Sequence, residues 1–204
     1  MLIALVNGER TEATPRTSGI CQECDEGVKA KCGLIKIWHW AHAPGTKCER
    51  ARYGMTEWHL GWLRSFPKEK IEIALTVDGK KHIADVIQGK TVLEFQRKMM
   101  PPDKMLEREH FWKKAGYQFH WIFDGREAYD SDRFSITSKM KGNADKPYWK
   151  FCWKMAPTRN LGCAFPWSID IGNGRIFEIR KLHSDRRPFC GWGYLKWNAS
   201  ISQL

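Results

Sequence analysis

Residues 82–98, HIADVIQGKTVLEFQRK, contain two acidic side chains in a setting that otherwise suits a buried sheet. The stretch consists of two short apolar segments on either side of Gly89, with Asp85 in the first segment and Glu94 in the second. A carboxylate in a sheet interior is unfavourable unless a cation or hydrogen-bond donors compensate its charge. The two acids therefore indicate a site for a positively charged group.

The pair Gly89-Lys90 is typical of a type II′ turn and predicts a two-residue hairpin. With this turn Asp85 lies directly opposite Glu94, and side chains in directly opposed positions have Cβ atoms about 4.5–5.5 Å apart. Gln96 follows Glu94 by two residues and points to the same face. We expect a hard divalent cation, Mg²⁺ or Mn²⁺, between the two carboxylates. The alternative is a pair of ordinary acids near a turn, balanced by Lys80, Lys81, Lys90, Arg97 and Lys98.

The surrounding segments predict an α/β (α+β) core. Apolar residues recur at three- and four-residue steps over 54–66, which predicts a helix that Pro67 ends. Three strands follow within 70–98, then a helix over 101–116 and a strand over 117–123. In this order the last strand should return parallel by a right-handed crossover.

Three regions are expected along the chain. Residues 1–50 predict a β-rich module with cysteine and histidine pairs, which opens on a hairpin turn at Asn7-Gly8. Residues 51–135 form the α/β core, and 136–204 form a β-rich C-terminal extension that begins with a polar linker or exposed loop. Most of the 11 tryptophans are expected in cores, and a base-stacking role for some of them is left open.

Two pairs of soft and borderline ligands lie in the first region. Cys21 and Cys24 are followed by His39 and His42, which supplies two sulfur and two nitrogen donors. Four protein ligands form a closed tetrahedral set, so we expect a structural rather than catalytic zinc ion. Cys32 and Cys48 are alternative ligands, one of which could replace a histidine, although reduced buried thiols are the preferred interpretation of both.

Composition indicates the partner and the compartment. The chain has 204 residues and a formal net charge of +11, which favours nucleic acid over a membrane surface as a partner. The apolar run at residues 1–6 is too short for a signal peptide or a membrane span. Seven cysteines, unevenly spaced, favour reduced thiols or metal ligation over a disulfide framework. We expect a soluble, cytoplasmic protein.

Residues 84–96, ADVIQGKTVLEFQ, resemble the Asp…Glu-x-Gln signature of the PD-(D/E)XK nuclease superfamily, in the form seen in CoiA-like competence proteins. Four further motifs agree with that family in their order: MLIAL at 1–5, CQEC at 21–24, HWAH at 39–42 and TEWH at 56–59. The resemblance covers roughly residues 1–124. It implies a restriction-endonuclease-like core and a Mg²⁺-dependent deoxyribonuclease.

By this resemblance Asp85 and Glu94 bind the metal ion, and Gln96 takes the place of the lysine found in most of the superfamily. A neutral amide can hydrogen-bond to a water molecule but lacks the lysine charge. Glu57 matches an acidic residue on the first helix that helps to hold or orient the metal. His59, in the same motif, would contact phosphate or a metal-bound water. For Glu57 a solvated helix-face acid, and for His59 a structural histidine, are the alternatives.

The resemblance and the positive charge together predict contacts with DNA. Arg108 matches a family arginine that binds phosphate, with an ion pair inside its own helix as the alternative. The residues expected to contact nucleic acid are Lys98, Arg108, Lys113, Arg180 and Arg186. DNA is preferred to RNA as the substrate, and DNA uptake, recombination or defence as the process. A catalytically inactive DNA-binding or adaptor protein with the same fold is the competing hypothesis, and homo-oligomerisation is left open.

Overall fold

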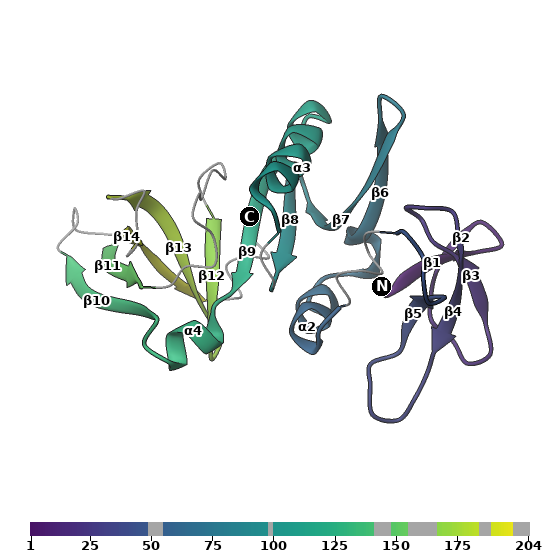
Figure 1. Cartoon of the computed structure of the whole chain (residues 1–204), viewed down its shortest axis with the longest axis horizontal. Coiled ribbons are helices and arrows are strands. Elements are labelled where there is room, and N and C mark those ends of the chain that lie inside the picture. The colour runs from purple at the N-terminus through teal and green to yellow at the C-terminus, as the bar shows by residue number, and fades with distance from the viewer. Residues whose placement is uncertain (49–54, 98–99, 141–147, 155–166, 184–188, 198–204) are drawn as a thin grey trace. The chain divides into compact units, whose positions relative to one another are not determined.

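The computed structural model describes the chain except for residues 49–54, 98–99, 141–147, 155–166, 184–188 and 198–204 (Figure 1). The chain divides into two compact units, Met1–Ile87 and Gln88–Leu204. Within the described residues, no helix has the length and apolar character needed to cross a membrane.

An antiparallel five-stranded sheet opens the first unit, with the order β2-β1-β3-β4-β5. Its strands are β1 (Ile3–Val6), β2 (Glu9–Glu12), β3 (Ser18–Ile20), β4 (Gly27–Lys31) and β5 (His39–His42). The turn between β1 and β2 is the predicted Asn7-Gly8 hairpin, in which both residues have positive φ, 53° and 83°. Positive φ at both central positions is the requirement of a type I′ turn.

The first unit continues with a helix and two strands. Helix α2 (Glu57–Arg64) begins at Thr56, whose hydroxyl accepts a hydrogen bond from the His59 amide. A short 3₁₀ turn, η1 (Lys68–Lys70), leads into β6 (Ile71–Val77), which pairs antiparallel with β7 (Lys80–Gln88). The helix and the turn at residues 78–79 agree with the sequence prediction.

Glu72 in β6 connects this strand to the N-terminal sheet. Its carboxylate oxygen Oε2 accepts hydrogen bonds from the backbone amides of Leu2 at 2.7 Å and Ile3 at 2.6 Å. Glu72 is fully buried and has a positive φ of 49°, a conformation that is uncommon for a residue with a side chain. The side chain of Arg10 donates to the carbonyl of Ile71 beside it. The N-terminal sheet is thus attached to β6 by a buried, charge-assisted contact.

The second unit contains one sheet with the order β10-β11-β14-β13-β12-β9-β8. Strand β8 (Thr91–Gln96) is followed by helix α3 (Pro102–Lys114), strand β9 (Gln118–Asp124) and the short helix α4 (Arg126–Asp130). The later strands are β10 (Phe134–Met140), β11 (Tyr148–Trp153), β12 (Trp167–Gly172), β13 (Arg175–Leu182) and β14 (Phe189–Trp197).

Strands β8 and β9 are parallel, with α3 between them in sequence, which confirms the predicted parallel return of the last strand. Strand β12 also runs parallel to β9, so the strands of the C-terminal region continue the sheet that begins with β8. The polar linker predicted from residue 136 is wrong for 136–140, because β10 extends through Met140. The rest of that predicted linker, 141–147, lies outside the described residues.

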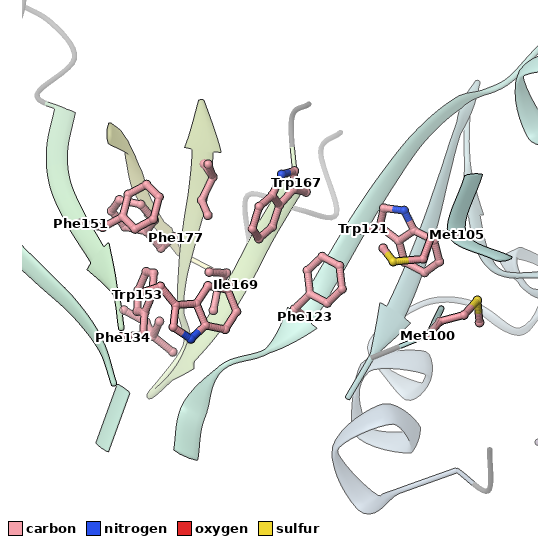
Figure 2. Close-up of a cluster of buried hydrophobic side chains, with 12 residues drawn as sticks. Met100, Met105, Trp121, Phe123, Phe134, Phe151, Trp153, Trp167, Ile169 and Phe177 are labelled. Carbon is pink, nitrogen blue, oxygen red and sulfur yellow. The ribbon is translucent and has the colours of Figure 1, made fainter. Parts of the chain in front are cut away.

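One face of this sheet carries an aromatic core. Trp121, Phe123, Trp167 and Phe177 belong to a buried cluster that also includes Phe134 (Figure 2). Two glycines of β14 let the backbone of β13 approach closely beside this core, because a Cβ at Gly191 would lie 1.8 Å from the Lys181 carbonyl oxygen and one at Gly193 2.1 Å from the Glu178 carbonyl oxygen. Since side chains alternate along a strand, the intervening residues point to the other face of the sheet.

Candidate functional site

The turn between β3 and β4 presents Cys21 and Cys24 from one short segment. The amide of Glu23 donates to the Cys21 Sγ at 3.4 Å, and the Cys21 amide donates to the Glu26 carbonyl at 2.8 Å. Asp25 has a positive φ of 59°, which turns the chain back toward β4. An amide aimed at a sulfur favours a thiolate, the form of cysteine that binds metal ions.

Four ligand atoms converge beside this turn, those of Cys21, Cys24, His42 and Cys48, all within 4.8 Å of one another. The Cys24 Sγ lies 3.3 Å from the His42 Nε2. Tetrahedral zinc with bonds near 2.3 Å would separate its ligand atoms by about 3.8 Å, so the group fits such an ion. Burial is the main effect on the Cys21 thiol and raises its pKa, so a nearby cation is needed to stabilise the thiolate.

His39 is not a member of this group, and Cys48 is present in its place. Positions three apart on a strand point to opposite faces, so His39 and His42 cannot both face Cys21 from β5. The His39 Nδ1 instead lies 2.8 Å from the Ile37 carbonyl. The alternation rule applied to the expected strand would have excluded a ligand set that contains both His39 and His42. Cys32 packs against the neighbouring buried cluster, as expected of a structural thiol.

In the first unit, Asp85 is held by a histidine from helix α2. Asp85 lies in β7 with 4% of its surface exposed, and its Oδ2 is 3.1 Å from the His59 Nε2. The Thr56 cap starts the helix so that His59 falls in its first turn. A buried carboxylate requires such a partner, and an imidazole can supply either a hydrogen bond or a charge.

Glu57 occupies a different side of the same helix. Residues two apart on a helix point about 200° away from each other, so Glu57 does not share the direction of His59. Its exposed side chain lines a cavity of about 420 Å³ together with His39, His42 and Leu60. Of the two helix residues that the family resemblance singles out, His59 is thus the one that contacts Asp85.

In the second unit, Glu94 is paired with an arginine from helix α3. Glu94 lies in β8, with 2% of its surface exposed, between flanking buried residues. The Nη1 of Arg108 donates to the Glu94 Oε2 at 2.9 Å, and the Arg108 side chain is only 13% exposed. A partner of Arg108 therefore lies outside its own helix, on strand β8. The ion pair compensates a charge that would otherwise be costly to bury.

Gln96 ends β8, half-buried, at the carboxyl edge of the parallel strands. A cluster of charged side chains that was not identified from the sequence, Asp124 with Arg126 and Arg97, lies at the same edge of these strands. Asp124 ends β9 and accepts hydrogen bonds from Arg126 at 2.8 and 2.9 Å, while the Arg97 Nε lies 3.6 Å from it. The contact raises the pKa of Arg126. The position of Asp124 directly after a buried parallel strand was the signal that could have indicated this group.

The residues predicted to contact nucleic acid are dispersed. Lys113 is exposed near the end of α3, and Arg180 is on β13, where it donates to Glu178. Lys98 and Arg186 lie outside the described residues.

Comparison with protein families places both motifs in one family. Residues 8–51 match the competence protein CoiA N-terminal domain, and residues 82–144 match the competence protein CoiA nuclease-like domain. Comparisons with curated proteins and with solved structures find no match. The first matched span contains the Cys₃His group, and the second contains Asp85, Glu94, Gln96 and Arg108. Together the spans cover just over half of the chain, which therefore belongs to the competence protein CoiA family.

Proposed function

We propose that this chain is a nuclease that uses a divalent cation to hydrolyse the phosphodiester bonds of DNA, in DNA uptake, recombination or defence. The match to a nuclease-like domain and the net charge of +11 support this proposal. The observation that carries it is the burial of two carboxylates, Asp85 and Glu94, each with a partner that can compensate its charge.

The donor set suits Mg²⁺ or Mn²⁺. These ions prefer oxygen ligands and are often held by one or two carboxylates. Gly89 has a positive φ of 58°, as the predicted two-residue turn between β7 and β8 requires. In the hairpin register predicted from the sequence, Asp85 and Glu94 are opposed and would bind the same cation. When bound, the cation would lower the pKa of a water ligand and offset charge on the phosphoryl group.

The residues around the cation would then have separate roles in hydrolysis. His59 orients the Asp85 carboxylate through its 3.1 Å contact. Gln96 orients the attacking water by hydrogen bonding. Arg108 can exchange the Glu94 carboxylate for a DNA phosphate, because a guanidinium binds both anions with the same planar geometry. Glu57, which the family pattern assigns to the metal site, points to a different side of helix α2 from His59, so we assign it no contact with the cation.

We further propose that Cys21, Cys24, His42 and Cys48 bind a structural zinc ion. Three thiolates and one imidazole leave no coordination position open for water, which separates this site from the hydrolytic one.

The test of the proposed activity is cleavage of labelled DNA by the full chain. Linear, nicked and single-stranded DNA, with RNA as a separate substrate, are incubated with Mg²⁺ or Mn²⁺. We expect DNA cleavage that falls at least 100-fold in Asp85→Asn and in Glu94→Gln. Glu107→Gln is the matched control, because Glu107 lies on α3 and pairs with Lys104 at 3.0 Å. Equal cleavage by the wild type and the two site variants would overturn the assignment.

The second candidate is a DNA-binding protein without catalytic activity. The ion pair between Arg108 and Glu94, and the amide of Gln96 at a position where most of the superfamily has lysine, favour this hypothesis. It predicts DNA binding by all of these variants and cleavage by none of them.

A further inference from the structure

Three aromatic side chains lie along the face of the second sheet that is opposite the aromatic core. Tyr148 and Trp192 have ring centroids 5.3 Å apart, and Trp192 and Tyr194 have centroids 5.9 Å apart. All three are partly exposed. Trp192 and Tyr194 are two apart on β14, and Lys150, which is opposite Trp192, is two residues from Tyr148 on β11. The alternation of side chains therefore places the three rings on one face.

The hydrophobic core does not account for these rings. The core uses the alternate positions, such as Phe151 on β11 and Phe177 on β13, and the glycines at 191 and 193 of β14 lie on that side, against the β13 backbone and these rings. An aromatic row that is only partly buried, on the second face of a sheet, is costly to leave in water. Such a row is typical of a surface that binds a flat, apolar group.

Cations surround the same row. The guanidinium of Arg180 lies over the Tyr194 ring, 5.5 Å from its centroid. Lys150 is exposed beside Trp192, and Lys196 follows Tyr194 by two residues on β14. Glu178, opposite Tyr194, is buried and binds both Arg180 and Lys196, so it fixes where these two cations lie. Among the described residues named here, the three cations outnumber the one carboxylate.

We infer that the face formed by Tyr148, Trp192, Tyr194, Lys150, Arg180 and Lys196 binds single-stranded DNA. Aromatic platforms beside cations hold unpaired bases by stacking and the backbone by charge, with little dependence on sequence. A duplex presents its phosphates but keeps its base faces stacked inside, so it would leave the three rings unused. The inference rests on the proposed function in one respect, namely that DNA is the nucleic acid on which the chain acts.

The test measures how tightly the full chain binds a fluorescein-labelled oligo(dT) of 15 nucleotides. Binding is monitored by the fluorescence anisotropy of the label, without added Mg²⁺ or Mn²⁺. Trp192→Leu should weaken binding about tenfold, within the range for the loss of one stacked base, and Trp192→Phe should stay within about threefold of the wild type. Lys150→Ala should lower the slope of log K against log salt by about 1. Lys29→Ala, at an exposed position of β4, is the matched control and should keep the slope unchanged.

Several results would overturn the inference. These are unchanged binding in Trp192→Leu, equal or tighter binding of a duplex, and equal or tighter binding of oligo(rU). Thermal unfolding and zinc content of Trp192→Leu, matched to the wild type, separate lost binding from lost folding. No divalent cation is added, so this assay measures binding separately from the proposed cleavage. Failed cleavage with intact binding counts against the nuclease proposal alone, and failed binding with intact cleavage counts against this inference alone.

Discussion

The Nη1 of Arg108 lies 2.9 Å from the Oε2 of Glu94, and neither side chain is more than 13% exposed. The contact joins helix α3 to strand β8 at the acid that the family pattern assigns to the metal site. The same arginine therefore stabilises the fold and competes with any cation for that carboxylate. This competition allows the stability of the protein to report on the site.

Replacing Arg108 with methionine should lower the free energy of unfolding by about 3 kcal/mol without divalent cations, because it leaves a buried carboxylate without its charged partner. The double variant Arg108→Met/Glu94→Gln should recover most of this loss. The free energy of unfolding of each variant is measured by urea denaturation, with tryptophan fluorescence as the signal. Equal losses in the single and the double variant would show that the ion pair carries none of the effect.

The zinc proposal distinguishes Cys48 from His39. Cys48→Ser should lower the zinc content of the purified protein well below one ion per chain and reduce its melting temperature. His39→Ala should retain the metal, because the His39 ring lies against the Ile37 carbonyl and outside the ligand group. Elemental analysis of both variants decides between the two ligand sets. Zinc retained in Cys48→Ser and lost in His39→Ala would restore the ligand set expected from the sequence.

Glu72→Ala should destabilise the protein by about 3 kcal/mol, because it removes the acceptor for two buried backbone amides. Glu69→Ala, an exposed change in η1, should stay within about 0.5 kcal/mol of the wild type. Hydrogen exchange at the amides of Leu2 and Ile3 should become faster in Glu72→Ala. If exchange at these two amides stays as slow as in the wild type, Glu72 does not attach β1.

Because His120 is buried in its neutral form, we expect the protein to lose stability in acid. Burial lowers its pKa from 6.5 to about 4, with the nearby Glu178 opposing the shift, while its Nε2 lies 2.9 Å from the Ser168 hydroxyl. The unfolded chain binds a proton near pH 6.5 and the folded chain only near pH 4. This contribution to stability is therefore complete above about pH 6.5 and is lost as the pH falls towards 4, by about 3 kcal/mol in total.

The matched variant is His120→Gln, which keeps a hydrogen-bonding side chain and removes the titration. Urea unfolding of both proteins between pH 4 and 7 should give a smaller slope of free energy against pH for His120→Gln. The same slope in both proteins would assign the acid sensitivity to other groups.

The parts of the fold that local patterns determine were predictable from the sequence. Alternating apolar residues and the turns at Asp78-Gly79 and Gly89 predicted β6, β7 and β8. The predicted helix stop at Gly116 agrees with α3, which ends at Lys114, and Gly116 has a positive φ of 85°. Parallel pairing of β8 and β9 was predicted from the order strand, helix, strand. Each of these features depends on short-range sequence alone.

Contacts between distant residues were less predictable. Glu94, which pairs with Arg108, is 14 residues away on another element, so the sequence near Arg108 did not indicate this contact. Cys48 reaches the Cys₃His group through the loop after β5, and its spacing from Cys24 gives no recognisable motif. Along β14, glycines interrupt the apolar pattern because backbone carbonyl oxygens of β13 lie where their Cβ atoms would be, which obscured the aromatic row on the other face.

The most direct test of the central claim is a titration of the zinc-loaded protein with Mn²⁺ in the absence of DNA. Electron paramagnetic resonance measures the concentration of unbound Mn²⁺, and the difference from the total gives the bound ion. The account predicts one Mn²⁺ bound per wild-type chain and per Glu107→Gln chain, and no ion bound by Asp85→Asn or Glu94→Gln in the same concentration range. Undiminished Mn²⁺ binding in either site variant, or none in the wild type, would contradict a cation held jointly by these two carboxylates.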